Sequence, residues 1–76
     1  MKKNLFETAN PGDIFITKDG REAIFLCLTH DMYGRRKAQM FLQHDNTKFV
    51  SGIYWVFLDG TIDDGFDNDA NIIKSK

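Results

Sequence analysis

Five aspartates lie close together in residues 59–69, and carboxylates at short spacing are typical ligands of Ca²⁺ and Mg²⁺. They are Asp59, Asp63, Asp64, Asp67 and Asp69. An EF-hand loop needs oxygen ligands at positions 1, 3 and 5 and a glycine at position 6. A loop starting at Asp67 has Ile72 at position 6, and one starting at Asp63 has Gly65, which lacks a ligand, at position 3. The sequence excludes this motif and favours Asp-rich turns that bond to their own backbone, although a looser cation site stays open.

Two histidines, each followed by an aspartate, could bind Zn²⁺ or iron if they converged. The pairs are His30-Asp31 and His44-Asp45. A hairpin that turns at Gly34 would place His30 opposite Lys37 and His44 opposite Ala23. The two histidines would then lie about 20 Å apart along the strands. We therefore expect no shared metal ion.

Cys27 is the only cysteine, so no internal disulfide can form, and a reducing cytoplasm fits this composition. It lies in an apolar segment, where we expect it to act as a small hydrophobic residue. No neighbouring Lys, Arg or His would activate it as a nucleophile. The sequence also lacks the G-x-S-x-G, P-loop, G-x-G-x-x-G and C-x-x-C patterns. These observations predict a non-enzymatic protein without catalytic residues, metal or cofactor.

Basic residues near aromatic ones suggest an alternative function in nucleic-acid binding, because small β barrels combine basic grooves with rings on which bases stack. The candidate residues are Lys18, Arg21, Tyr33, Arg35, Arg36 and Lys37. Either Tyr54 or Trp55 must face outward in an alternating strand and could stack on a base. Against this, the formal net charge is −1, and basic loop residues are usually solvated.

The segment IYWVFL, residues 53–58, offers two apolar stripes, and both are hard to bury in a chain of 76 residues. One stripe holds Tyr54, Val56 and Leu58, and the other holds Ile53, Trp55 and Phe57. Either one stripe is exposed as a protein-contact surface, or both lie in a filled core that the N-terminal segment helps to cover. We predict binding to a protein partner or to a second copy through Tyr54, Trp55 and Phe57.

These candidate residues lie in segments that alternate between strand and turn signals. Strands are predicted at residues 13–17, 22–30, 37–44 and 53–58, with short ones around Ile62, at Ile72-Ile73 and at Phe49-Val50. Asp19-Gly20 and Asp59-Gly60 are strong hairpin signals. Residues 22–30 are apolar at both alternating sets of positions, which predicts a strand buried on both faces.

About five short strands in one domain, residues 1–76, predict an all-β fold, and a small SH3-like barrel or roll would leave no exposed strand edge. The alternative is an α+β fold with a helix at residues 2–9 or 35–44. The N-terminal residues include no secretory apolar run, and no segment has the length of a membrane span. We expect a cytoplasmic protein without a membrane partner.

The run PGDIFITKDGREAIFLCL, residues 11–28, and the later strand that ends at Asp59-Gly60 resemble small, uncharacterised β-rich proteins of gut bacteria and their phages. The resemblance covers about a third of the chain. Its motif encodes a tight turn and implies no catalytic residues. It implies a phage or prophage accessory protein, such as one that binds a host factor.

Overall fold

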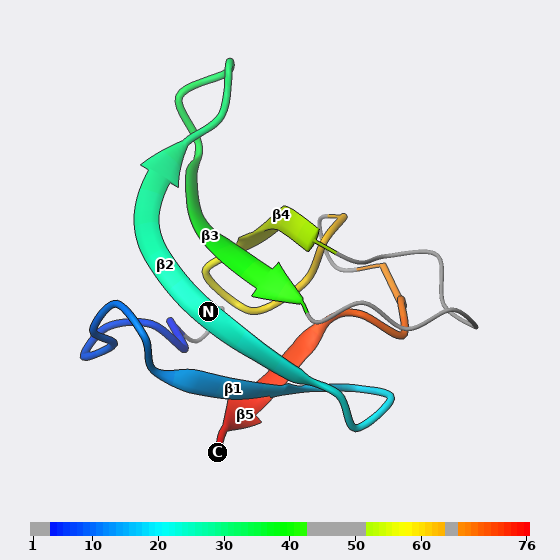
Figure 1. The fold of residues 1–76 in the computed structure, drawn as a ribbon. Coiled ribbons are helices and arrows are strands. Elements are labelled where there is room, and N and C mark those ends of the chain that lie inside the picture. Colours follow the sequence, from blue (N-terminus) through cyan, green and yellow to red (C-terminus); the bar gives the residue numbers. More distant parts are fainter. Residues whose placement is uncertain (1–3, 43–51, 64–65) are drawn as a thin grey trace.

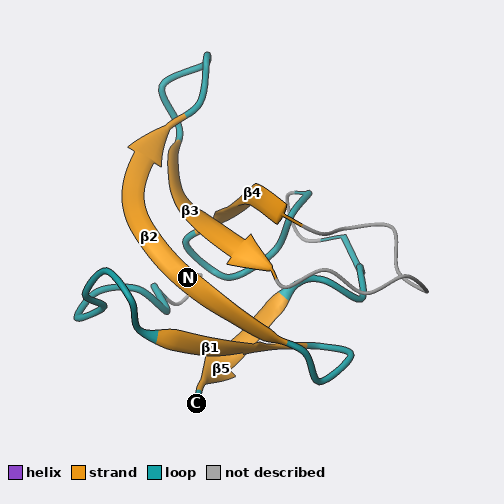
Figure 2. Cartoon of the chain, in the orientation of Figure 1, coloured by secondary structure: helices purple, strands orange, loops and turns teal. Residues whose placement is uncertain are grey.

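The computed structural model describes residues 4–42, 52–63 and 66–76. Its five strands form one antiparallel sheet in the order β4-β3-β2-β1-β5 (Figure 1). The strands are β1 (Ile14–Thr17), β2 (Glu22–His30), β3 (Arg36–Leu42), β4 (Gly52–Phe57) and β5 (Ile72–Ser75). The all-β prediction is confirmed. The α+β alternative is wrong for the described residues, which contain strands and loops only (Figure 2).

The predicted closure into a barrel is wrong, because the curled sheet ends at β4 on one side and at β5 on the other. A strand around Ile62 could have joined these edges, but none forms there. The Ile62 N–H donates instead to the Asn71 side-chain oxygen (2.8 Å). The Ile72 N–H donates to the carbonyl of Gly60 (2.8 Å), so a turn rather than a strand lies next to β5. The sheet therefore keeps two edge strands.

The core lies on the inner face of the sheet, under the N-terminal segment. Phe6 is 1% exposed, and its ring centroid lies 4.9 Å from that of Phe15 and 5.6 Å from that of Phe25. The Leu5 N–H donates to the Leu58 carbonyl (2.8 Å) and holds this segment against the turn after β4. Strands β2, β3 and β4 contribute further fully buried residues, namely Ala23, Ala38, Met40, Leu42 and Val56. The N-terminal segment therefore covers one face of the sheet.

β2 is buried on one face only, which corrects the prediction that both of its faces are buried. Ala23 and Phe25 are in the core, whereas Ile24, which faces the other way, is 37% exposed. Cys27 is also exposed, so its predicted place in the interior is wrong. The physical reason is that an open sheet of this size forms a single layer, and its one covering segment lies on the inner face.

The register of the β2–β3 hairpin differs from the predicted one. His30 pairs with Arg36 rather than Lys37, and Ala23 pairs with Leu42. The register shifts between Phe25 and Cys27, as in a β-bulge, where one strand contributes an extra residue. Residues 43–51 lie outside the described residues, so His44 and the predicted strand at Phe49-Val50 do too.

Candidate functional site

Four exposed apolar side chains form a surface on the outer face of the sheet, which we call the outer patch. They are Ile24 (37% exposed), Phe41 (41%), Ile53 (61%) and Trp55 (45%). The register places Ile24 opposite Phe41, and Phe41 opposite Ile53. Directly opposed residues share a face of the sheet, and Trp55 shares the face of Ile53 because it lies two residues further along β4. Three strands thus present one continuous apolar row to solvent.

The structure divides the three predicted protein-binding residues between the two faces of β4. Trp55 and Phe57 belong to the outer face, while Tyr54 and Val56 face the core. The half-buried Tyr54 hydroxyl donates to the Ala70 carbonyl (3.0 Å), so this residue holds the 66–71 segment rather than offering a contact surface. The predicted alternation is confirmed, and Ile53 and Trp55 form the exposed part of the aromatic strand.

Sequence reasoning missed Ile24 and Phe41 as parts of this surface. Both occupy alternating positions in predicted strands, and that was the available signal. The signal was insufficient because the positions share a row only in the observed register. The bulge between Phe25 and Cys27 sets that register, and the residue types at these positions do not predict a bulge.

Burial raises the pKa of the Tyr54 hydroxyl well above its ordinary value, with nearby Arg21 opposing the shift and Asp19 adding to it. The folded state therefore holds this proton more tightly than the unfolded state, in which tyrosine ionises near pH 10. The contribution of the protonated hydroxyl to the free energy of unfolding is fully present below about pH 10 and is lost as the pH rises further. We expect the free energy of unfolding to fall more steeply above about pH 10 in the wild type than in Tyr54→Phe, by up to about 1.4 kcal/mol per pH unit.

Urea unfolding followed by circular dichroism at a series of pH values measures this difference. The matched control is Tyr33→Phe, because Tyr33 is 75% exposed in the β2–β3 turn. This control should lose stability in parallel with the wild type. Equal slopes for Tyr54→Phe and the wild type would contradict the assignment.

Part of the predicted nucleic-acid site gathers at the β2–β3 hairpin. The Arg35 guanidinium carbon lies 5.2 Å from the Tyr33 ring centroid and 5.0 Å from that of Phe57. The Lys37 ammonium lies 3.9 Å from the Phe57 centroid. Asp31 forms an ion pair with Arg35 (2.7 Å), which partly neutralises the cluster. Arg36 is exposed next to it.

The other two basic candidates, Lys18 and Arg21, lie at the opposite end of β2 and do not join this cluster. Lys18 forms an ion pair with Asp67, and Arg21 donates to Asp19 (2.9 Å). Burial alone would raise the pKa of the Asp19 carboxyl, but hydrogen bonds from Thr17 and Arg21 outweigh it and hold the pKa below its ordinary value. Arg21 therefore takes part in holding the β1–β2 turn.

Two aspartates of the C-terminal segment form contacts within the protein, one with the nearby Thr61 and one with the distant Lys18. The Asp59 carboxylate accepts from the Thr61 N–H (3.1 Å) and from the Thr61 hydroxyl (2.7 Å). Asp67 pairs with Lys18. Within residues 4–42, 52–63 and 66–76, no three His, Cys, Asp or Glu side chains are arranged to hold a metal ion. Asp64 lies outside these ranges.

The exposed Cys27 lies on the outer face beside the patch. It pairs with Gln39, which pairs in turn with Trp55. Its thiol lies 3.6 Å from the Gln39 side-chain oxygen, so it can donate only a weak hydrogen bond there. As the only cysteine in the sequence, it marks this face for chemical labelling.

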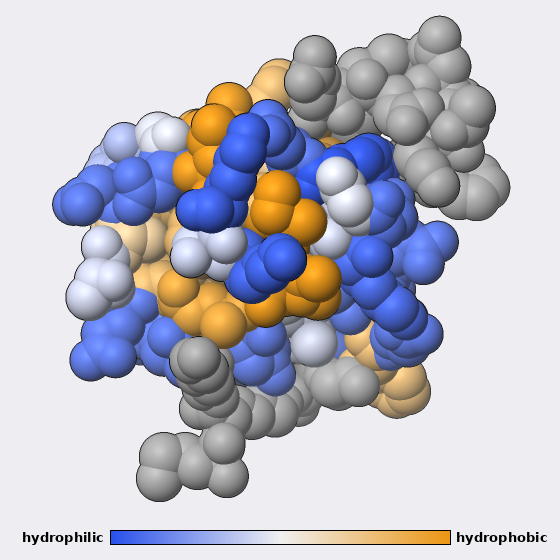
Figure 3. Space-filling view, turned by 90° about the horizontal axis from the view of Figure 1, so that it is seen from below, coloured by the Kyte–Doolittle hydropathy of each residue, from blue (hydrophilic) through white to orange (hydrophobic). Residues whose placement is uncertain are grey.

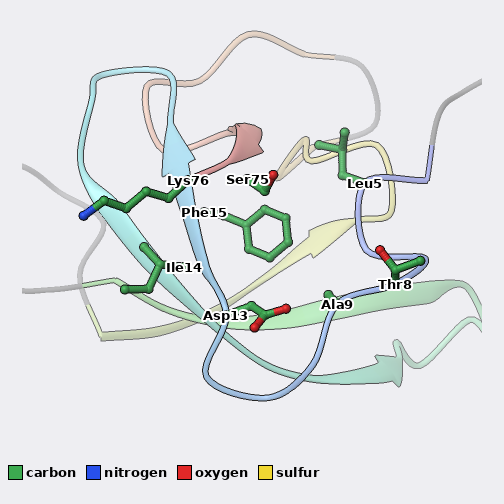
Figure 4. Close-up of a pocket in the computed structure, with 8 residues that line it drawn as sticks. All are labelled: Leu5, Thr8, Ala9, Asp13, Ile14, Phe15, Ser75 and Lys76. Atoms are coloured by element: carbon green, nitrogen blue, oxygen red, sulfur yellow. The ribbon is translucent and has the colours of Figure 1, made fainter.

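A pocket of about 500 Å³ lies between the N-terminal segment and strands β1 and β5. Figure 4 shows the Phe15 ring near the centre of its lining, with Leu5, Thr8 and Ala9 across from the strands. The two charged lining residues already have partners. Asp13 accepts from the Asn10 N–H (2.9 Å), and Lys76 pairs with Glu22. The lining therefore provides little chemistry that would recognise a charged ligand.

The surface on the underside of the molecule, where β1 and β5 lie in Figure 1, combines apolar and polar side chains. Apolar atoms gather in one area that polar side chains surround (Figure 3). Among the described residues, no helix is long and apolar enough to cross a membrane.

Comparisons with known proteins identify no relative of this chain. No family model, no curated protein and no solved structure matches it.

Proposed function

We propose that this chain is a non-enzymatic binding module that contacts another protein through the outer patch. The observation that carries the proposal is the continuous row of Ile24, Phe41 and Ile53 with Trp55 beside it, all exposed on one face. Aromatic and aliphatic side chains that protrude together are typical anchors of protein interfaces. The curled sheet is the form expected of an SH3-like roll, and its edges add backbone groups for contact. A phage or prophage accessory role would be compatible with such a module.

A pull-down from a bacterial lysate that also contains an untagged copy of this chain tests the patch with Trp55→Ala and the matched control Phe66→Ala. Phe66 is 71% exposed and lies outside the outer patch. We expect the wild type and the control to retain the same protein in high salt and after nuclease treatment. Trp55→Ala should weaken retention by at least about 30-fold, which corresponds to roughly 2 kcal/mol for a tryptophan at an interface centre. Equal retention by the wild type and Trp55→Ala would contradict the proposal.

A second candidate function is the binding of single-stranded nucleic acid, favoured by the cations that lie over Phe57. Arg35 and Lys37 both contact its ring, and Trp55 follows on the same face. Base stacking beside such cations is a known mode of sequence-tolerant binding. Trp55 is the only tryptophan, so its fluorescence reports on this surface directly. Quenching by an oligonucleotide that weakens steeply with salt would favour this function, because counterion release drives phosphate binding.

A further inference from the structure

We infer that the protein partner is a second copy of this chain, joined edge to edge through β4, the strand that carries Ile53 and Trp55 of the outer patch. This inference rests on the proposed function and names both the partner and the strand through which the partner binds. The two β4 strands would run antiparallel about a two-fold axis at Tyr54. Each Ile53 would then face Trp55 of the other copy. The two five-stranded sheets would continue into one another.

The hydrogen-bonding groups of β4 support this register. The Phe57 N–H donates to Thr61 (2.7 Å), and its carbonyl accepts from Gly60 (2.8 Å), so both groups point toward the turn and away from β3. Alternate residues of a strand direct their backbone groups to the same side. Ile53 and Trp55 therefore also direct theirs away from β3. A two-fold axis at Tyr54 pairs Ile53 of each copy with Trp55 of the other. Each pair forms two backbone hydrogen bonds, four in all, and Phe57 keeps its own hydrogen bonds to the turn.

The side chains of β4 leave this edge unprotected. Natural edge strands usually carry lysine, proline or a bulge that prevents pairing with another chain. β5, the other edge, has Lys74, and its pairing with β1 shifts register between Ile16 and Thr17. β4 has the sequence GIYWVF, without a charged residue or proline. Pairs of an aromatic and a β-branched residue, such as Trp55 with Ile53, are also favourable across strands.

The surface area available explains why backbone pairing is needed. A stable interface buries roughly 800 Å² on each partner, about a sixth of the 5094 Å² accessible surface of this chain. The outer patch exposes on the order of a few hundred Å² of apolar side chain, which is too little alone. Pairing of the β4 edges adds main-chain contacts and extends the apolar row of each copy into Trp55 of the other.

The charges near β4 favour the antiparallel arrangement. Arg35 and Lys37 lie over Phe57 at the C-terminal end of this strand. Antiparallel pairing places the two cation clusters at opposite ends of the seam. Parallel pairing would bring them side by side, and like charges that face each other across an interface are costly.

The first test measures molecular mass by light scattering over a range of concentrations. Ile53→Lys places a charge at the seam, and Ile73→Lys makes the same change at a half-exposed position on the other edge strand. We expect a dimer for the wild type and for Ile73→Lys. Ile53→Lys should raise the dissociation constant by more than about 100-fold, because each lysine would replace the apolar partner of Trp55 and the two lysines would be diagonal neighbours across the seam. Circular dichroism confirms that each variant is folded.

The second test needs no substitution at the seam. A spin label on Cys27 reports the distance between the two copies, because this exposed residue is the only cysteine. Five strand spacings separate the two labels, two within each copy and one across the seam. At about 4.8 Å per spacing, this gives a separation of about 20–25 Å in a curled sheet. Outer faces packed against each other would place them about 10 Å apart.

Three results would overturn the inference: a wild-type monomer at every concentration, a label separation near 10 Å, or a dimer lost equally in Ile53→Lys and Ile73→Lys. A monomer would leave the proposed function intact, since the pull-down with Trp55→Ala tests that function separately. A dimer with the expected label separation that only Ile53→Lys dissociates would support both.

Discussion

Gly60→Ala is expected to lower the free energy of unfolding by about 2–5 kcal/mol. Gly60 has φ +91°, and a Cβ added there would lie 2.0 Å from the Ile72 carbonyl oxygen and 2.9 Å from Leu5 Cδ1. The oxygen belongs to the backbone of β5 and cannot move alone. Left-handed strain costs an L-residue about 1–2 kcal/mol, and overpacking adds about 1–3 kcal/mol. This loss is a large fraction of the roughly 4–11 kcal/mol of total stability expected for 76 residues.

The matched control for this prediction is Gly34→Ala. Gly34 also has positive φ, +79°, but a Cβ there meets nothing within 4 Å. This variant should lose only about 1–2 kcal/mol from the backbone strain. Urea unfolding followed by circular dichroism compares the two. Equal losses would show that the close approach of Gly60 to Ile72 is unimportant.

Phe6→Ala is expected to cost about 3–5 kcal/mol, the usual loss for a buried phenylalanine. Phe6 is the covering side chain that contacts both Phe15 and Phe25. Its removal leaves a cavity and weakens the hold of the N-terminal segment, which keeps the Leu5–Leu58 hydrogen bond and the packing of Leu5 and Ala9 against the core. The free energy of unfolding in urea measures the loss, with Trp55 fluorescence as a second probe.

Phe66→Ala is the matched control, because Phe66 is 71% exposed. An exposed substitution of this kind changes stability by less than about 0.5 kcal/mol. A loss below about 1.5 kcal/mol for Phe6→Ala would mean that the segment covering the core contributes little to its stability. Hydrogen exchange at the Leu5 amide separates local detachment of the segment from global unfolding.

The sequence predicted the strands well because their turns carry local signals. Asp19-Gly20 lies in the turn that connects β1 and β2, and Gly20 has the positive φ (+88°) that this turn requires. The alternation of Tyr54 and Trp55 also followed from a local rule. These features depend on residues that are neighbours in the sequence, so composition and spacing are sufficient to find them.

The features that escaped prediction depend on distant parts of the chain. Whether one or both faces of β2 are buried depends on where Phe6 packs, and Phe6 lies outside any strand pattern. The outer patch depends on the register of Ile24 against Phe41, which a bulge sets. The predicted short strand around Ile62 is absent because the Ile62 N–H donates to the side-chain oxygen of Asn71, nine residues away, instead of to a neighbouring strand.

The pairing of β1 with β5 also constrains how the protein is made. Phe15 pairs with Ser75, so the second neighbour of an early strand is synthesised near the end of this sequence. The hydrogen bond from the Leu5 N–H to Leu58 can form only after Leu58 is synthesised, and the bond between the Ile72 N–H and Gly60 can form only after Ile72 is synthesised. Before the β5 residues leave the exit tunnel, the β1–β2–β3 meander can form but lacks an edge and part of its cover. Completion of the fold is therefore expected after the β5 residues leave the exit tunnel, and chaperones that bind nascent chains would meet β1 with its second edge open.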